Sequence, residues 1–527
     1  MRVTIFLRLC SPLLRLGRPT WLCRWRPNKE SGGASLDRKL EEIILSVFRT
    51  APSEPCVWWH GVWWSRGALR ELAEDCQANL LSGGFVSGNR LALLLPNCPL
   101  FWALCVAVWS IGGTVVPLNP RLEFSTLLRN LILADVFGAV IYKEQEDKVA
   151  LLEDRGIPCV VAPLAGVQPS FKGRVLPDEK ITDIAAIFLT SGTTGDAKAV
   201  PLTHSNFIHN MDACLKVVTQ IDEEDVFLNA LPNFHSLGFA VCGLLPLVYG
   251  LPQAIVPSFM PPESTLEAIR SAKVTVVPAV PMMVSLLLGC IARGINPPPS
   301  LSLIICGGDR LSVKLAERAE RLLGVTILEG YGLTETSPVL SVNPNKEEAR
   351  KGTCGKVLPC FEVEIRGGEG QIVAPGTEGD LWVRGPSVAG SYFRMPQLTA
   401  ERFIDGWFDT RDIVSLDEDG YLTVVSRVSD IVIVGGYNVY PGEVESVLME
   451  HPDVLESAVV GVSRGASGEV IKAFVVLKEG RILNPRDLIT FCRTRLAYYK
   501  IPRVVAFVKG LPRSSVGEVI KRELKNR

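Results

Sequence analysis

The chain has 527 residues, of which 47% are hydrophobic and 21% charged, the balance of a globular protein with a large buried core. This length is too great for one ordinary domain. The formal net charge of −1 gives no global field that would attract nucleic acid or an anionic membrane. The 14 cysteines are scattered without a CxxC pair, which fits neither a zinc site nor a small disulfide scaffold. Buried thiols in a reducing compartment are favoured.

The first 29 residues differ from the rest, because arginines and one lysine occur there without any acidic residue and with Leu, Ile, Phe and Trp between them. This composition suits a membrane interface. It is also typical of a mitochondrial transit peptide, and a disordered tail is the third alternative. We expect a cytoplasmic protein that contacts a membrane surface through residues 1–28, with a mitochondrial location as the alternative.

Residues 91–120 carry no charge and could be mistaken for a transmembrane helix. Prolines and glycines interrupt the stretch, whereas a span needs about 20 apolar residues without such breaks. The pattern predicts a buried strand at 90–95, a helix at 100–112 and a second strand at 113–118.

Short β-branched runs alternate with helical patterns through most of the chain. Further strands are predicted at 139–143, 158–162, 273–280 and 301–308, and helices at 264–272 and 313–323. This alternation predicts an α/β protein with largely parallel sheets. From about residue 352, strands separated by Gly, Asp and Pro turns predict an antiparallel, barrel-like part. We expect a large domain over 30–426 and a small α+β domain over 427–527.

The stretch "TSGTTGDAKAV" at residues 190–200 follows the apolar strand "AAIFL" and is the most informative segment. Glycines let backbone N–H groups approach an anion closely. Successive N–H groups and hydroxyls can cradle phosphate oxygens, and Lys198 adds positive charge. The spacing is not the Walker pattern, because no GK[ST] ends the loop.

This loop closely resembles the phosphate loop of the acyl-adenylate-forming enzymes, which include acyl-CoA synthetases, luciferases and the adenylation domains of peptide synthetases. Four further motifs occur in family order, and the resemblance covers the chain from about residue 35. They are "LPNFHSLG" at 231–238, "EGYGLTETS" at 329–337, "GWFDTRD" at 406–412 and "SRVSDIVIVGGYNVYPGEVE" at 426–445. The resemblance implies a large domain of two sheets and a barrel-like part, followed by a small domain that rotates between two half-reactions.

The resemblance assigns roles to residues of these motifs. Tyr331 would stack on adenine, Thr334 would contact a phosphate oxygen, and Asp412 would bind both ribose hydroxyls. Glu335 would hold Mg²⁺, which favours carboxylate and phosphate oxygens. The implied ATP/AMP-binding set is Thr190, Ser191, Gly192, Thr193, Thr194, Gly195, Lys198, Gly308, Tyr331, Thr334, Asp412 and Arg427.

Three further regions follow from the same resemblance. Around the acyl group, the expected pocket residues are His235, Gly238 and Gly307. Ser429 occupies the hinge, and Gly435 and Gly436 would line the tunnel for the thiol substrate. An aspartate that grips an amine in amino-acid-activating relatives is absent at the histidine position. The substrate is therefore expected to lack an α-amino group.

The segment 236–261 contains no charged residue. A second carboxylate on the substrate would need a cation there, so an aliphatic, medium- or long-chain fatty acid is favoured. The expected enzyme is an acid–thiol ligase that uses ATP and Mg²⁺ and transfers the acyl group to CoA or an acyl-carrier protein. The expected catalytic residues are Lys198, His235, Thr334, Glu335 and Glu518.

Several positions depart from the family pattern. Glu518 in "LPRSSVGEV" stands where the family carries a catalytic lysine, and Lys521, one helical turn on, is a candidate substitute. Arg411 replaces a usual glycine, so we expect an altered turn there. These changes leave two alternatives open, a relative with impaired adenylation and a non-catalytic protein that binds nucleotide or acyl group. An adenylating enzyme without a thiol step is a third.

Overall fold

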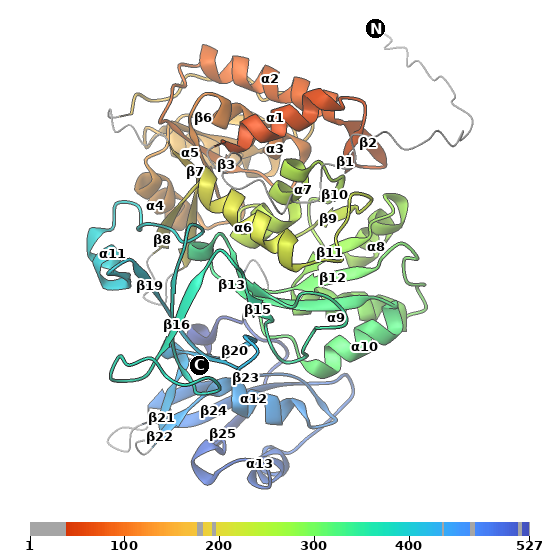
Figure 1. The fold of residues 1–527 in the computed structure, drawn as a ribbon, viewed down its shortest axis with the longest axis vertical. Coiled ribbons are helices and arrows are strands. Elements are labelled where there is room, and N and C mark those ends of the chain that lie inside the picture. Colours follow the sequence, from red (N-terminus) through yellow and green to blue (C-terminus); the bar gives the residue numbers. More distant parts are fainter. Residues whose placement is uncertain are drawn as a thin grey trace. The chain divides into compact units, whose positions relative to one another are not determined.

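The computed structural model describes residues 38–176, 183–191, 197–434, 437–463, 469–514 and 519–525. Residues 1–37 lie outside this part, and with them the predicted targeting or membrane segment. The described residues build a mixed α/β fold, which confirms the predicted fold class (Figure 1).

The first sheet is coloured orange to yellow in Figure 1 and has six strands in the described residues, in the order β6-β5-β3-β4-β7-β8. All neighbouring pairs are parallel except β7 and β8, which form an antiparallel hairpin. The strands are β3 (Arg90–Leu94), β4 (Thr114–Pro117), β5 (Gly138–Tyr142), β6 (Cys159–Ala162), β7 (Ile184–Ser191) and β8 (Ala197–Thr203).

The second sheet has nine strands in the described residues, in the order β15-β14-β13-β12-β11-β9-β10-β1-β2. Its centre, from β13 to β1, is parallel. The strands are β1 (Pro55–Trp59), β2 (Val62–Ser65), β9 (Phe227–Asn229), β10 (Gln253–Ile255), β11 (Val276–Ala279), β12 (Leu303–Cys306), β13 (Thr326–Gly332), β14 (Val339–Val342) and β15 (Lys356–Val357).

The predicted antiparallel part is also present. It consists of β16 (Glu362–Arg366), β17 (Gly379–Arg384), β18 (Phe403–Ile404), β19 (Trp407–Leu416) and β20 (Leu422–Arg427), all in antiparallel pairs. The chain then forms a smaller mixed unit with a core of its own. Its strands are β21 (Val432–Val434), β22 (Tyr437–Val439), β23 (Val454–Ser463), β24 (Glu469–Leu477) and β25 (Val504–Phe507).

Helices connect the strands of the two large sheets. They are α1 (Leu40–Thr50), α2 (Arg66–Ser82), α3 (Pro99–Ser110), α4 (Phe124–Ala134), α5 (Val149–Glu153), α6 (His204–Val217), α7 (Leu245–Tyr249), α8 (Pro262–Ser271), α9 (Pro281–Ala292) and α10 (Val313–Leu323). Later in the chain lie α11 (Pro396–Arg402), α12 (Pro441–Met449), α13 (Pro485–Arg493) and α14 (Lys521–Lys525). Their ends carry the expected signals, such as the Thr203 side chain that accepts from the Asn206 N–H at α6.

The uncharged stretch 91–120 folds as β3, α3 and β4, as predicted from its prolines and glycines. Every residue of α3 from Pro99 to Trp109 is buried, because the helix packs against α1 and α2 as well as the sheet. Among the helices of the described residues, none combines the length and apolarity needed to cross a membrane. The described cysteines are all free thiols, and most are buried.

Candidate functional site

The hairpin of β7 and β8 carries the predicted phosphate loop at its tip. Thr190 pairs with Lys198 and Ser191 with Ala197 across the two strands, so both ends of the loop are held side by side. Gly192, Thr193, Thr194 and Gly195 lie outside the described residues. The hairpin fixes the position of Lys198, the cationic residue of the loop.

Lys198 lies among several other charged side chains. Its Nζ is 5.6 Å from the centroid of the Tyr392 ring, a distance typical of a cation–π contact. Burial lowers the pKa of the Lys198 ammonium, and Arg402, Arg427 and Arg411 lower it further, whereas Glu335 raises it. Several cations are therefore gathered near Lys198, where an anionic ligand would relieve their mutual repulsion.

Thr334 and Glu335 lie in a 3₁₀ turn, η4 (Thr334–Thr336), that follows the end of β13. Thr334 Oγ1 is 3.0 Å from Ser236 Oγ, which joins this turn to the histidine motif. Glu335 is 8% exposed, and its Oε1 accepts a hydrogen bond of 2.7 Å from the Tyr392 hydroxyl.

Magnesium fits this arrangement. Within the described residues no group of three His, Cys, Asp or Glu side chains could hold a metal ion by itself. Mg²⁺ does not need such a group, because it commonly binds through one or two carboxylates and completes its shell with substrate phosphates and water. The described residues donate no hydrogen bond to Glu335 Oε2, which leaves one carboxylate oxygen available for such a role.

Asp412 on β19 joins two predicted nucleotide-binding residues. Its Oδ2 accepts a hydrogen bond of 2.5 Å from the Tyr331 hydroxyl, and its Oδ1 is 3.3 Å from Arg427 Nε. Burial raises the pKa of the Asp412 carboxyl, while Arg427 and the Tyr331 hydroxyl oppose that shift. The structure thus brings together three residues that lie 81 and 15 positions apart in the sequence.

Arg411 precedes Asp412 and has a φ of +61°, in the left-handed region that favours glycine. The pairing of β17 with β19 shifts register at this point. The Asp409 carboxylate accepts the Arg411 N–H at 2.9 Å. We expected an altered turn here; instead, the arginine takes a backbone conformation that suits glycine.

His235 lies in the loop before a π-helix, η3 (Gly238–Leu244), a kind of segment that is frequent at functional sites. Burial lowers the pKa of His235 to about 4, so the imidazole is neutral at physiological pH. A Cβ at Gly238 would come within 2.3 Å of the Pro232 carbonyl oxygen, so this position needs glycine.

An apolar cavity of about 10 Å³, room for roughly one water molecule, adjoins these residues. Its lining consists of Leu231, Pro232, His235, Leu237, Gly238, Val280 and Gly308. Gly307, the other predicted pocket residue, sits where a Cβ would approach the Gly330 carbonyl at 3.2 Å. An acyl chain would therefore have to displace side chains such as Leu237 and Val280.

The predicted hinge residue Ser429 lies in a 3₁₀ turn, η5 (Val428–Asp430), directly after β20. Gly435, Gly436 and Glu518 are outside the described residues. Lys521, the candidate substitute for the family's lysine, forms an ion pair of 2.9 Å with Glu445. Its charge is already neutralised within the small unit, which argues against that substitution.

Two contacts of the site were missed by the sequence analysis, those of Tyr392 and Ser236. Tyr392 reaches Glu335 over 57 residues, and Ser236 reaches Thr334 over 98. For Ser236 the signal was its place inside the histidine motif. No pattern around Tyr392 indicates its partner.

Comparison with known proteins agrees with this geometry. Residues 46–393 match the AMP-binding enzyme family, and residues 443–518 match the AMP-binding enzyme C-terminal domain. A long-chain-fatty-acid–CoA ligase from Yersinia pestis is 32% identical, over 87% of this chain and 89% of its own. A 2-succinylbenzoate–CoA ligase from Geobacillus kaustophilus is 34% identical, over 87% and 91%.

Among solved structures, the o-succinylbenzoate coenzyme A synthetase from Bacillus subtilis, in complex with ATP and magnesium ion, has the same fold. The TM-score is 0.80 at 28% identity, with 92% of this chain and 99% of that chain covered. The chain therefore belongs to the AMP-binding enzyme family. Within that family it is of the acid–CoA ligase type that these relatives represent.

Proposed function

We propose that this protein is an ATP-dependent acid–CoA ligase that acts on an aliphatic, medium- or long-chain fatty acid. The observation that carries the proposal is the convergence of Lys198, Glu335 and Asp412 from three separate segments. Lys198 and Glu335 both contact Tyr392, and Asp412 accepts a hydrogen bond from Tyr331, which lies on the strand before the turn that carries Glu335. The names of the relatives add fatty acid, ATP and CoA as candidate substrates.

In the first half-reaction, a carboxylate oxygen of the acid attacks the α-phosphorus of ATP and pyrophosphate leaves, which gives acyl-AMP. Lys198 and the arginines near it would offset the negative charge that accumulates. Asp412 would orient the ribose, since a carboxylate can accept two hydrogen bonds. Mg²⁺, held by Glu335, would neutralise phosphate charge.

In the second half-reaction, the sulfur of CoA attacks the acyl carbon and AMP leaves. His235 would border the reacting group as a neutral imidazole, because burial keeps its pKa at about 4. Ser429 would act as the hinge between a large domain over 30–426 and a small one over 427–527. Gly435 and Gly436 would line the tunnel for the thiol. An acyl-carrier protein as acceptor has no support among the relatives.

Aliphatic substrates are favoured by the uncharged segment 236–261 and by the apolar lining of the cavity beside His235. A second carboxylate in such a lining would lack a cation. One relative is named for succinylbenzoate, so the panel of test acids must include an aromatic dicarboxylate.

Glu518 favours a second candidate, a relative that binds nucleotide and acyl-AMP but adenylates poorly. An acid in place of a phosphate-binding lysine should slow the first half-reaction by about 10²–10³, the scale for one lost electrostatic stabiliser. The candidate replacement cation, Lys521, is already engaged in an ion pair with Glu445.

The deciding experiment measures acid-dependent pyrophosphate release and acyl-CoA formation by the full chain, with C8 to C18 fatty acids and succinylbenzoate. The variants are Glu518→Lys and, as a charge-reversal control on the exposed face of α14, Glu523→Lys. Turnover of fatty acids by the native chain supports the ligase. If Glu518→Lys alone adenylates, or the native chain converts only added acyl-AMP, the impaired relative is correct. No turnover by either chain contradicts both.

A further inference from the structure

A short loop, residues 389–394, contacts both the strand that carries Lys198 and the turn that carries Glu335. We call it the bracing loop. It follows β17 and ends one residue before Met395, the N-cap of α11. No motif of the sequence includes it, and none of the roles given above uses it.

Backbone contacts tie the bracing loop to both sides of the site. The Ala389 N–H donates to the Glu335 carbonyl oxygen at 2.8 Å, and the Phe393 N–H donates to the Ala199 carbonyl oxygen at 2.8 Å. Ala199 is the neighbour of Lys198 on β8. The loop is thus bonded to the turn that carries Glu335 and to the strand that carries Lys198.

Tyr392, between these two anchors, contacts the functional side chains themselves. Its hydroxyl donates to Glu335 Oε1 at 2.7 Å, and its ring lies under the Lys198 ammonium at 5.6 Å. The residue is 2% exposed, and its ring packs edge-on against Phe403 with centroids 5.5 Å apart. A buried, packed tyrosine has little freedom to turn away from either partner.

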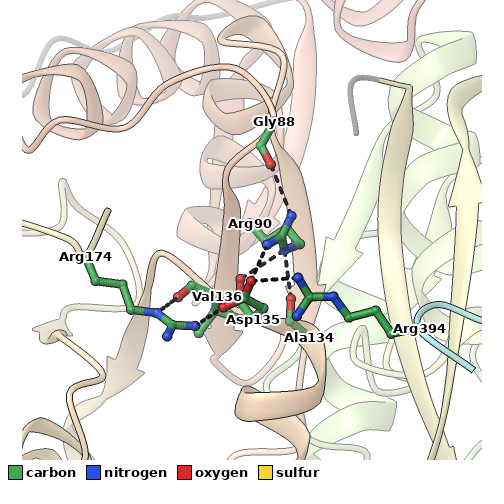
Figure 2. Close-up of polar contacts among 7 residues, drawn as sticks. All are labelled: Gly88, Arg90, Ala134, Asp135, Val136, Arg174 and Arg394. Atoms are coloured by element: carbon green, nitrogen blue, oxygen red, sulfur yellow. Dashed lines mark hydrogen bonds and ion pairs between the residues drawn. The ribbon is translucent and has the colours of Figure 1, made fainter. Parts of the chain in front are cut away.

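The last residue of the bracing loop is held by an ion cluster at the start of β3 and the end of α4, drawn in Figure 2. Arg394 Nη2 is 3.0 Å from Asp135 Oδ2, and Asp135 also accepts from Arg90 and Arg174. Arg90 is 1% exposed and additionally donates to the Ala134 carbonyl oxygen. This end of the loop is therefore fixed to the body of the domain.

We propose that Tyr392 is a positioning residue for the metal and nucleotide: its hydroxyl holds one oxygen of Glu335 so that the other faces Mg²⁺, and its ring seats Lys198 beside the phosphates. The proposal deepens the proposed function and rests on it for the identity of the nucleotide. Hydrogen-bond partners of ligating carboxylates typically change metal affinity by about 10- to 100-fold when they are removed.

The test uses the full chain and Tyr392→Phe, which keeps the packed ring and deletes only the hydroxyl. ATP binding is measured by calorimetry across a series of Mg²⁺ concentrations. We expect the Mg²⁺ concentration for half-maximal ATP binding to rise about 10-fold. At saturating Mg²⁺ the ATP affinity should return to within about twofold of the native value, because Phe preserves the seat of Lys198.

Tyr421→Phe is the matched control. Tyr421 is a buried tyrosine whose hydroxyl donates to the Glu348 carbonyl oxygen at 2.6 Å, away from Glu335. Both variants keep the ring and lose one hydroxyl hydrogen bond, so both should melt at similar temperatures. The Mg²⁺ dependence should move in Tyr392→Phe alone.

The outcomes separate this inference from the proposed function. An unchanged Mg²⁺ dependence in Tyr392→Phe, or an equal change in the control, overturns the positioning role even if the native chain is an active ligase. A shifted Mg²⁺ dependence in Tyr392→Phe supports the positioning role even if the native chain never releases pyrophosphate, a result that contradicts the ligase. No Mg²⁺-dependent ATP binding by the native chain overturns both.

Discussion

Two buried aspartates of this chain are held by arginine, yet they are held differently. Asp135 has both carboxylate oxygens in contact with guanidinium groups, those of Arg90, Arg174 and Arg394. Asp412 has a tyrosine hydroxyl on one oxygen and, on the other, Arg427, whose side chain is 57% exposed. A ligand could replace the partners of Asp412, whereas the partners of Asp135 are built into the fold.

A structural acid and a binding acid differ in how completely their partners replace the lost hydration. Burial raises the pKa of Asp412, which means that its partners do not fully compensate its lost hydration. Ligand hydroxyls would supply the missing hydrogen bonds. An acid that is buried and left short of partners is therefore a better candidate for binding than one enclosed by cations.

The largest expected effect is that of Asp135→Asn on stability. Removing the carboxylate leaves guanidinium charges facing one another, so unfolding free energy should fall by about 3–5 kcal/mol, the range for breaking a buried ion pair. Backbone strain does not confuse the test, because Asp135 has a φ of +49° and asparagine tolerates that region. Denaturant titration measures the change. The exposed pair of Asp419 with Arg350 is the control: Asp419→Asn should cost under about 1 kcal/mol.

Asp412→Asn should show the opposite pattern. Its stability should stay within about 1 kcal/mol of the native chain, because the asparagine oxygen can still accept from the Tyr331 hydroxyl and water can solvate the exposed Arg427 guanidinium. ATP affinity should fall about 10²-fold, since two hydrogen bonds to a charged acceptor are weakened. Loss of stability without loss of ATP affinity would show that Asp412 is a structural acid, as Asp135 is.

Asp412→Asn also tests how the stability of the fold depends on pH. The folded pKa of Asp412 is raised, so the native chain holds this proton to higher pH than the unfolded chain does. Its contribution to stability is present below the ordinary pKa of the unfolded carboxyl and declines as the pH rises through the raised folded value. Asp412→Asn should lack that decline in denaturant titrations at successive pH values. An identical slope in both proteins would contradict the raised pKa.

The smallest expected effect is that of Arg411→Gly. Glycine adopts a φ of +61° without the steric cost that arginine meets there, so the variant should gain about 1 kcal/mol of stability. Thermal melting measures it, and Arg411→Ala, which keeps a Cβ, should gain nothing. A loss of stability in Arg411→Gly would show that the contact of the guanidinium with Asp409 outweighs the strain.

Sequence patterns identified the parallel strands well, because runs such as 90–95 and 139–143 are short and largely apolar and lie next to a proline or a glycine. They also named Asp412 and Tyr331, through a resemblance. The contact between those two side chains, and that of Tyr392 with Glu335, were beyond sequence reasoning. Such contacts depend on how the second sheet and the antiparallel part meet, and side-chain spacing carries no record of that.

Arg411 shows a second limit. A residue type that disfavours positive φ predicts a different turn, yet the Asp409 side chain and the register shift of β19 hold the backbone where it is. Local preference was overruled by neighbouring structure, at a cost of the order of 1 kcal/mol.

The bracing loop has a thermodynamic consequence. It is bonded to β8, to the turn after β13 and, through Arg394, to Asp135 at the end of α4. A ligand that binds only when these are in place must stabilise them by mass action, as any ligand of the native state does. Hydrogen exchange in α4 and β3, although neither supplies a ligand-binding residue, should therefore slow when Mg²⁺ and ATP are added.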